Sequence, residues 1–238
     1  MQPFEKWTVL PHGKLEEIDE GLLTVVGDLP MPAGDFPRRM TVVRLVDGRL
    51  VIFSAISLHE DEMQALERYG TPSFLIVPND IHRMDAKAWK DRYPSLVVVA
   101  PPGAREKVAE VVPVDASEID FGDPRVHYVN VPGTAGHEAA LVVERGGDAT
   151  LIVNDVIWNV EHRRGFRGTL LRLLGFTGEE PKIPKLVKLR AIKDQKAFKA
   201  QLERWASLNL RRIVVSHGEI VTHDPPAVLR ELAAKLAA

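Results

Sequence analysis

The sequence has no cysteine among its 238 residues. Disulfides, thiolate nucleophiles and cysteine-ligated zinc or iron–sulfur sites are therefore excluded, and a bound metal would need His, Asp, Glu or Asn as ligands. Long apolar runs are also lacking, because no uninterrupted stretch approaches the roughly 18–20 residues of a membrane span. The first residues carry acids where a signal peptide needs an apolar core, so we expect a cytoplasmic protein.

An excess of charge of one sign is missing as well. The 31 Lys and Arg residues nearly balance the 33 Asp and Glu residues, which gives no overall attraction to nucleic acid or to an anionic membrane. There is no glycine-rich phosphate loop, and no Gly-x-Ser-x-Gly elbow that would make Ser54 or Ser216 a nucleophile. We expect a small-molecule ligand, with neither nucleic acid nor membrane as a partner, and a homodimer is left open.

Short β-rich runs and helical segments alternate along the chain. One pair of apolar runs flanks Asp47-Gly48 and a second pair flanks Gly146-Gly147, which predicts two hairpins. The pattern predicts further strands at 22–28, 73–78, 96–100, 126–131 and 211–217, and helices at 60–69, 83–92, 105–111, 196–208 and 225–238. This order favours one α/β domain over residues 1–238, with a mixed, layered sheet covered by helices.

One segment, at about 161–194, is rich in Arg, Lys, Gly and Pro and interrupts this alternation. We interpret it as a basic, solvent-exposed insertion that overhangs the cleft. The functional alternative is that this segment forms a basic lid over a cleft that receives an anionic substrate.

Ligand-type side chains follow three of the expected strands. His82 comes after the run 73–78, Asp155 after the run 149–154, and His217 ends the run 211–217. Each has a structural explanation by itself, as a helix cap, a turn anchor or a buried histidine. Because ligand sites of layered α/β folds form where strands end, their joint placement predicts a cleft that could hold zinc, iron or manganese.

The order of these elements resembles the metallo-β-lactamase fold superfamily over nearly the whole chain from about residue 20. That superfamily carries a His-x-His-x-Asp-His motif before a helix that ends in an aromatic–proline pair. Anchoring on Tyr93-Pro94 places the last histidine of the motif on His82. Without gaps, the other motif positions hold Val77, Asn79 and Ile81. The resemblance implies an αββα sandwich of two mixed β-sheets flanked by helices.

The resemblance also implies at most one metal. The histidine of the superfamily's Pro-Gly-His stretch is missing from Pro132-Gly133-Thr134, although His137 lies close by. The first metal site of the superfamily has thus lost its ligands, whereas the second retains His82, Asp155 and His217. Asp80 or Asp85 could supply the carboxylate that the second site lacks.

The function implied is a divergent metal-dependent hydrolase. A water activated by one divalent metal would attack an ester, thioester, amide or phosphodiester. Asp155 and His82 would be the catalytic residues, and Asn79 and His137 would contact the substrate. The alternative is a non-catalytic binding module that kept the fold and binds no metal, and the metal content of the purified protein distinguishes the two.

Overall fold

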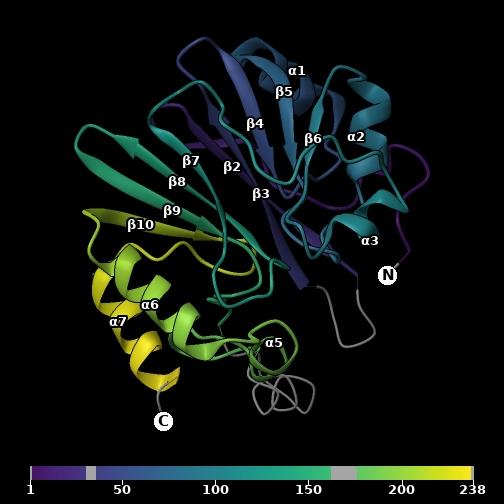
Figure 1. Cartoon of the computed structure of the whole chain (residues 1–238). Coiled ribbons are helices and arrows are strands. Elements are labelled where there is room, and N and C mark those ends of the chain that lie inside the picture. Colours follow the sequence, from purple (N-terminus) through teal and green to yellow (C-terminus); the bar gives the residue numbers. More distant parts are fainter. Residues whose placement is uncertain (1, 31–35, 162–175, 237–238) are drawn as a thin grey trace.

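The computed structural model describes residues 2–30, 36–161 and 176–236 and arranges them around two β-sheets that face each other (Figure 1). The first sheet has six strands in the order β1 (Glu16–Asp19), β2 (Leu22–Leu29), β3 (Phe36–Arg44), β4 (Arg49–Phe53), β5 (Thr71–Ile76) and β6 (Val97–Val99). The second has four strands in the order β10 (Leu210–Val215), β9 (Asp148–Val153), β8 (Ala139–Arg145) and β7 (Val126–Asn130). Both sheets are mixed, because β4, β5 and β6 run parallel in the first and β9 and β10 in the second.

Helices cover the outer face of each sheet (Figure 1). The first sheet carries α1 (Glu60–Tyr69), α2 (Ala86–Arg92) and α3 (Arg105–Ala109), and the second carries α6 (Gln195–Ala206) and α7 (Pro225–Leu236). A short helix, α5 (Lys185–Arg190), lies apart from these two layers (Figure 1). None of the described helices has the length and apolar character needed to cross a lipid bilayer.

The alternation of side chains along each strand separates the core into layers. On β3, Val42 packs beneath the helices, and its neighbour Val43 faces the second sheet. On β5, Leu75 likewise packs beneath the helices and Ile76 faces the second sheet. Because successive side chains of a strand point to opposite faces, a sheet covered on both sides must be apolar on both. The molecule is therefore the αββα sandwich that the sequence predicts.

Most element bounds differ from the sequence prediction by at most a few residues, and the helix 60–69 and both hairpins are confirmed. The helix predicted at 83–92 begins only at Ala86. The side-chain oxygen of Asn79 accepts the backbone N–H groups of Ile81 and His82, which holds this stretch in a turn before the helix. Strand β1 and helix α5 were not predicted as elements.

Candidate metal centre

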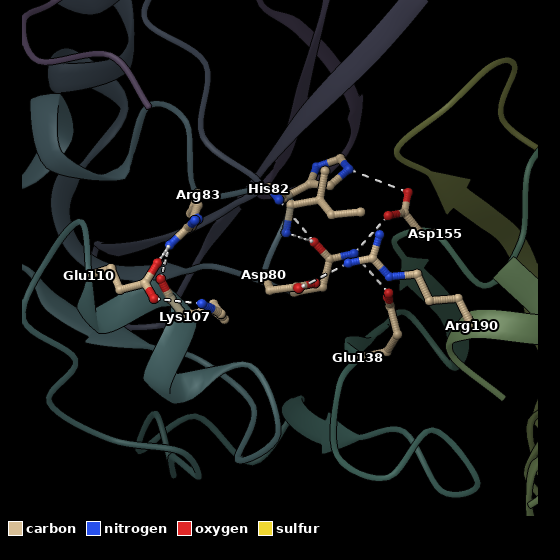
Figure 2. Close-up of polar contacts among 10 residues, drawn as sticks. Asp80, His82, Arg83, Lys107, Glu110, Glu138, Asp155 and Arg190 are labelled. Carbon is tan, nitrogen blue, oxygen red and sulfur yellow. Dashed lines mark hydrogen bonds and ion pairs between the residues drawn. The ribbon is translucent and has the colours of Figure 1, made fainter. Parts of the chain in front are cut away.

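Three strand ends bring His82, Asp155 and His217 together. Figure 2 shows the His82 ring directed at the Asp155 carboxylate. The Nε2 atoms of the two histidines are 3.2 Å apart, and Oδ1 of Asp155 lies 3.0 Å from Nε2 of His217 and 3.4 Å from Nε2 of His82. All three side chains are nine-tenths buried or close to it. Residues separated by up to 135 positions in the chain thus meet at one point.

These distances suit a metal ion. Around a tetrahedral ion with bonds of about 2.0–2.1 Å, neighbouring ligand atoms are roughly 3.3 Å apart. The three measured separations, 3.0, 3.2 and 3.4 Å, are close to that value. Oδ1 of Asp155 is buried and makes no hydrogen bond with any other described group. Two imidazole nitrogens and one carboxylate oxygen therefore fit a divalent metal and leave a fourth position open.

A hydrogen bond at Nδ1 orients each of the two imidazole rings. Nδ1 of His217 lies 2.7 Å from the carbonyl oxygen of Pro37, so Nδ1 carries the proton and Nε2 presents a lone pair. Nδ1 of His82 lies 2.8 Å from the hydroxyl of Ser54, which can accept its proton in the same way. The ring of Trp158 packs against His217 with 4.2 Å between the ring centroids. The two Nε2 atoms are consequently directed at the same point as the Asp155 oxygen.

Asn79 connects the parts of the site. Its Nδ2 group donates to Oδ2 of Asp155 at 2.7 Å and to Oε1 of Glu138 at 2.8 Å. Its Oδ1 atom accepts the backbone N–H groups of Ile81 and His82. These four bonds use the whole hydrogen-bonding capacity of a side chain that is only 2% exposed. They favour a positioning role for Asn79 rather than the substrate-binding role expected from the sequence.

Glu138 is a site residue for which the sequence pattern predicts no role. It is 2% exposed, and its Oε2 atom has no hydrogen-bond partner in the described structure. Burial and then the nearby charge of Asp155 raise the pKa of Glu138 well above its ordinary value. Burial also acts to raise the pKa of Asp155, but the imidazoles of His82 and His217 outweigh it and hold that pKa well below its ordinary value. The only sequence signal for Glu138 is its position directly after His137.

The two carboxylates suggested as a fourth ligand lie elsewhere. Asp85 forms a buried ion pair with Arg38, at 2.5 Å, and accepts the backbone N–H of Ser57. The carboxylate of Asp80 lies 3.4 Å from Nη2 of Arg190. Figure 2 shows the Arg190 side chain reaching toward Asp80. Neither joins the described group of three side chains whose ligand atoms all lie within 4.8 Å of one another. Their charges are compensated by arginines, so the fourth-ligand expectation finds no support.

The three residues lie at a cavity of about 470 Å³. His137 contributes to its wall, and its contact with a substrate stays a prediction. Of the segment 161–194, residues 162–175 lie outside the described part of the chain. The described remainder supplies Phe176 and the α5 residues Leu186, Val187 and Arg190 to the cavity wall. This part of the segment does border the cleft.

No protein-family model matches the chain, and no curated protein matches it either. Solved structures do. The metallo-β-lactamase FIM-1 from Pseudomonas aeruginosa, in a mono-zinc form, is 12% identical with a TM-score of 0.63 over 95% of this chain and 96% of that one. The metallo-β-lactamase DIM-1 is 14% identical with a TM-score of 0.64 over 97% and 100%. A metallo-β-lactamase from Hirschia baltica is 9% identical with a TM-score of 0.60 over 94% and 98%. The chain therefore has the metallo-β-lactamase fold.

Proposed function

We propose that the protein is a metal-dependent hydrolase that holds one divalent metal ion through His82, Asp155 and His217. The observation that carries the proposal is the spacing of the three ligand atoms, 3.0–3.4 Å, at a cavity of about 470 Å³. The fold shared with metallo-β-lactamases, one of them in a mono-zinc form, adds support. Zinc, iron and manganese all suit a set of two nitrogens and one oxygen.

Each described group around the centre has a defined task in this proposal. A divalent ion, when bound, would act as a Lewis acid and lower the pKa of the water that it binds toward neutrality. Asn79 holds Oδ2 of Asp155 and so leaves Oδ1 free for the ion. Pro37 orients the His217 ring from behind, and Trp158 shields one side of that ring from water. A carboxyl group binds a metal in its ionised form, so the charge of Asp155 would offset part of the charge of the ion.

The reaction is hydrolysis of an acyl bond. The oxygen of water forms a bond to the carbonyl carbon, the bond from that carbon to the leaving group breaks, and the leaving group departs with a proton from the water. Oδ2 of Asp155, which accepts one hydrogen bond from Asn79, keeps a second lone pair that could accept a hydrogen bond from the water. His82 has its Nε2 atom on the same side of the cavity, 3.4 Å from Asp155.

Metal analysis of variants tests the proposal. We expect one zinc or manganese ion per chain in the wild type by elemental analysis and calorimetric titration. His82→Ala and His217→Ala each remove one of three ligands and should abolish binding, whereas the control His137→Ala should not, because His137 is outside the ligand group.

Two other results would contradict the proposal. Two ions per chain would mean that a second site exists, with His137 as the first ligand to examine. No binding by the wild type would favour the alternative, a non-catalytic protein that binds a small molecule in the same cavity. In that case His82, Asp155 and His217 would hydrogen-bond one another or the ligand.

A further inference from the structure

The cavity wall beyond the metal centre is mainly apolar. Phe36, Trp158 and Phe176 form an aromatic cluster in which each ring centroid lies 5.0–6.3 Å from the others. Leu186 and Val187 of α5 line the same cavity. A cavity of about 470 Å³ is in the range that holds a drug-sized molecule. The wall offers an apolar group several aromatic and aliphatic surfaces to pack against.

The charges around the cavity disfavour an anionic ligand. Its described lining has four carboxyl groups, of Asp80, Asp85, Glu138 and Asp155, and two guanidinium groups, of Arg38 and Arg190. Nη1 of Arg38 pairs with Asp85, and its Nε and Nη2 atoms, which have no hydrogen-bond partner in the described structure, are buried. The exposed Arg190 lies 3.4 Å from Asp80. A negatively charged group would therefore find no exposed guanidinium group in the described lining that lacks a carboxylate partner.

Exposed apolar side chains also gather at this cavity. Among the described residues, large hydrophobic side chains are exposed at Val46, Ile81, Leu186 and Leu189. Ile81 is 46% and Leu186 48% exposed, and both line the cavity. Leu189, 78% exposed, follows on the same short helix. Exposed apolar side chains that lie together mark interaction sites, so the grouping of Ile81 and Leu186 favours an apolar ligand at the mouth of the cavity.

We infer that the substrate is an uncharged acyl ester whose apolar chain lies between the aromatic cluster and α5, with its carbonyl group at the metal centre. This inference rests on the proposed function for the reaction, but the binding of the apolar chain does not depend on the metal. The two can therefore fail separately. The basic-lid alternative for an anionic substrate is disfavoured by the described part of the cavity wall.

Binding is measured first, with the neutral dye Nile red as a fluorescent probe of the full-length protein. Hexanol, octanol and decanol should displace the dye with rising affinity, by about threefold to fourfold for each added methylene group. Decanoate, which has the same chain and a negative charge, should compete at least tenfold more weakly than decanol. Chelator-treated, metal-free wild type should bind dye and alcohols as the metal-loaded protein does, because removal of the ion leaves the apolar side chains of the wall in place.

A pair of surface variants tests the location. Leu186→Glu puts a charge at the mouth of the cavity and should weaken decanol binding at least tenfold. Val46→Glu makes the same change at an exposed apolar residue outside the cavity lining and should have no effect. Equal behaviour of the two variants, absence of displacement by decanol, or tighter binding of decanoate would each overturn the inference.

Hydrolysis is measured second, on the metal-loaded wild type. The kcat/KM for p-nitrophenyl esters should rise at least tenfold from acetate to octanoate. Chain-dependent binding without hydrolysis of any ester would refute the proposed function and leave the ligand class standing. Hydrolysis that is indifferent to chain length would support the function and refute the ligand class.

Discussion

Asn79 occupies the position at which the resemblance expects a metal-binding histidine, and it supports the site from behind instead. One amide group holds the carboxylates of both Asp155 and Glu138, and its oxygen fixes the turn that carries His82. Partners of this kind orient metal ligands, and their loss commonly costs about 10–100-fold in metal affinity. We therefore expect Asn79 to affect metal binding without touching the metal.

The variant Asn79→Ala should bind zinc about 10–100-fold more weakly while keeping the fold, because Asp155 loses its donor and the turn loses its acceptor. Asn79→Asp should be worse, since it places a third carboxyl group against two others. Zinc titration and circular dichroism measure both effects. The control is Asn130→Ala on β7, which removes an asparagine hydrogen bond to Ser117 outside the cavity lining. Equal zinc affinity in the Asn79 and Asn130 variants would contradict the positioning role.

The sequence predicts some site residues better than others. His82, Asp155 and His217 could be identified because each follows an apolar run, which is a local signal. The role of Asn79 could not, because its partners Glu138 and Asp155 lie 59 and 76 positions further along the chain. Hydrogen-bond partners of buried side chains depend on which strands become neighbours. The sequence pattern alone does not contain that information.

At the scale of elements, the turn after β10 determines where His217 is held. Gly218 has φ of +100°, and a Cβ atom there would lie 1.9 Å from the carbonyl oxygen of Asn159. The backbone N–H of Asn159 in turn donates to the carbonyl of His217. A side chain at this position would push the two segments apart and displace the histidine.

We expect Gly218→Ala to lower the free energy of unfolding by about 3 kcal/mol or more, through left-handed strain and the clash together. Zinc affinity should fall with it. Gly147→Ala is the matched control, since Gly147 also has a left-handed φ, +90°, but no atom within 4 Å of its Cβ position. Gly147→Ala should lower the free energy of unfolding by only about 1 kcal/mol, from left-handed strain alone. Urea unfolding measures both, and similar losses would argue against the clash.

Element positions were predicted better than element ends. Apolar periodicity identified the long strands and helices, because their burial dominates their local preferences. The start of α2 was missed because the backbone N–H of Ala86 bonds to the carbonyl oxygen of Arg83, three residues back, as in a turn, and the four-residue helical bonds begin only with Trp89 and Asp85. Helix α5 was missed because a short basic segment with few buried residues has little periodic signal.

At the scale of the whole molecule, Asp123 ties the two sheets together at a distance from the cleft. Its carboxylate accepts the backbone N–H of Val46, in the turn between β3 and β4, and pairs with Arg125, just before β7. The hydrogen bonds from the Arg125 side chain, and then those from the backbone, lower the pKa of Asp123 to about 2, although burial opposes this. The ionised form is therefore favoured by folding.

This pKa predicts an acid dependence of stability. Because the pKa is lower in the folded state than its value of about 3.9 in an unfolded chain, the stabilisation is complete above pH 4 and is lost as the pH falls through about 2. Asp123→Asn should cost about 2 kcal/mol at pH 7, and the difference from the wild type should shrink between about pH 4 and pH 2. The exposed Asp28→Asn is the control in urea titrations at several pH values. A pH-independent difference would mean that the charge of Asp123 is not the cause.

The guanidinium group of Arg39 on β3 has a consequence for how the protein is made. It donates to the carbonyl groups of Val215 and Gly218, which lie on either side of His217 in the sequence. These two residues are 176 and 179 positions further along the chain than Arg39. Closing so long a loop is entropically costly, and contacts this distant form slowly. A nascent chain that has completed only the first sheet lacks both Asp155 and His217. Metal loading is therefore expected to follow the synthesis and docking of the last strand, so that an unfinished chain does not compete for the ion.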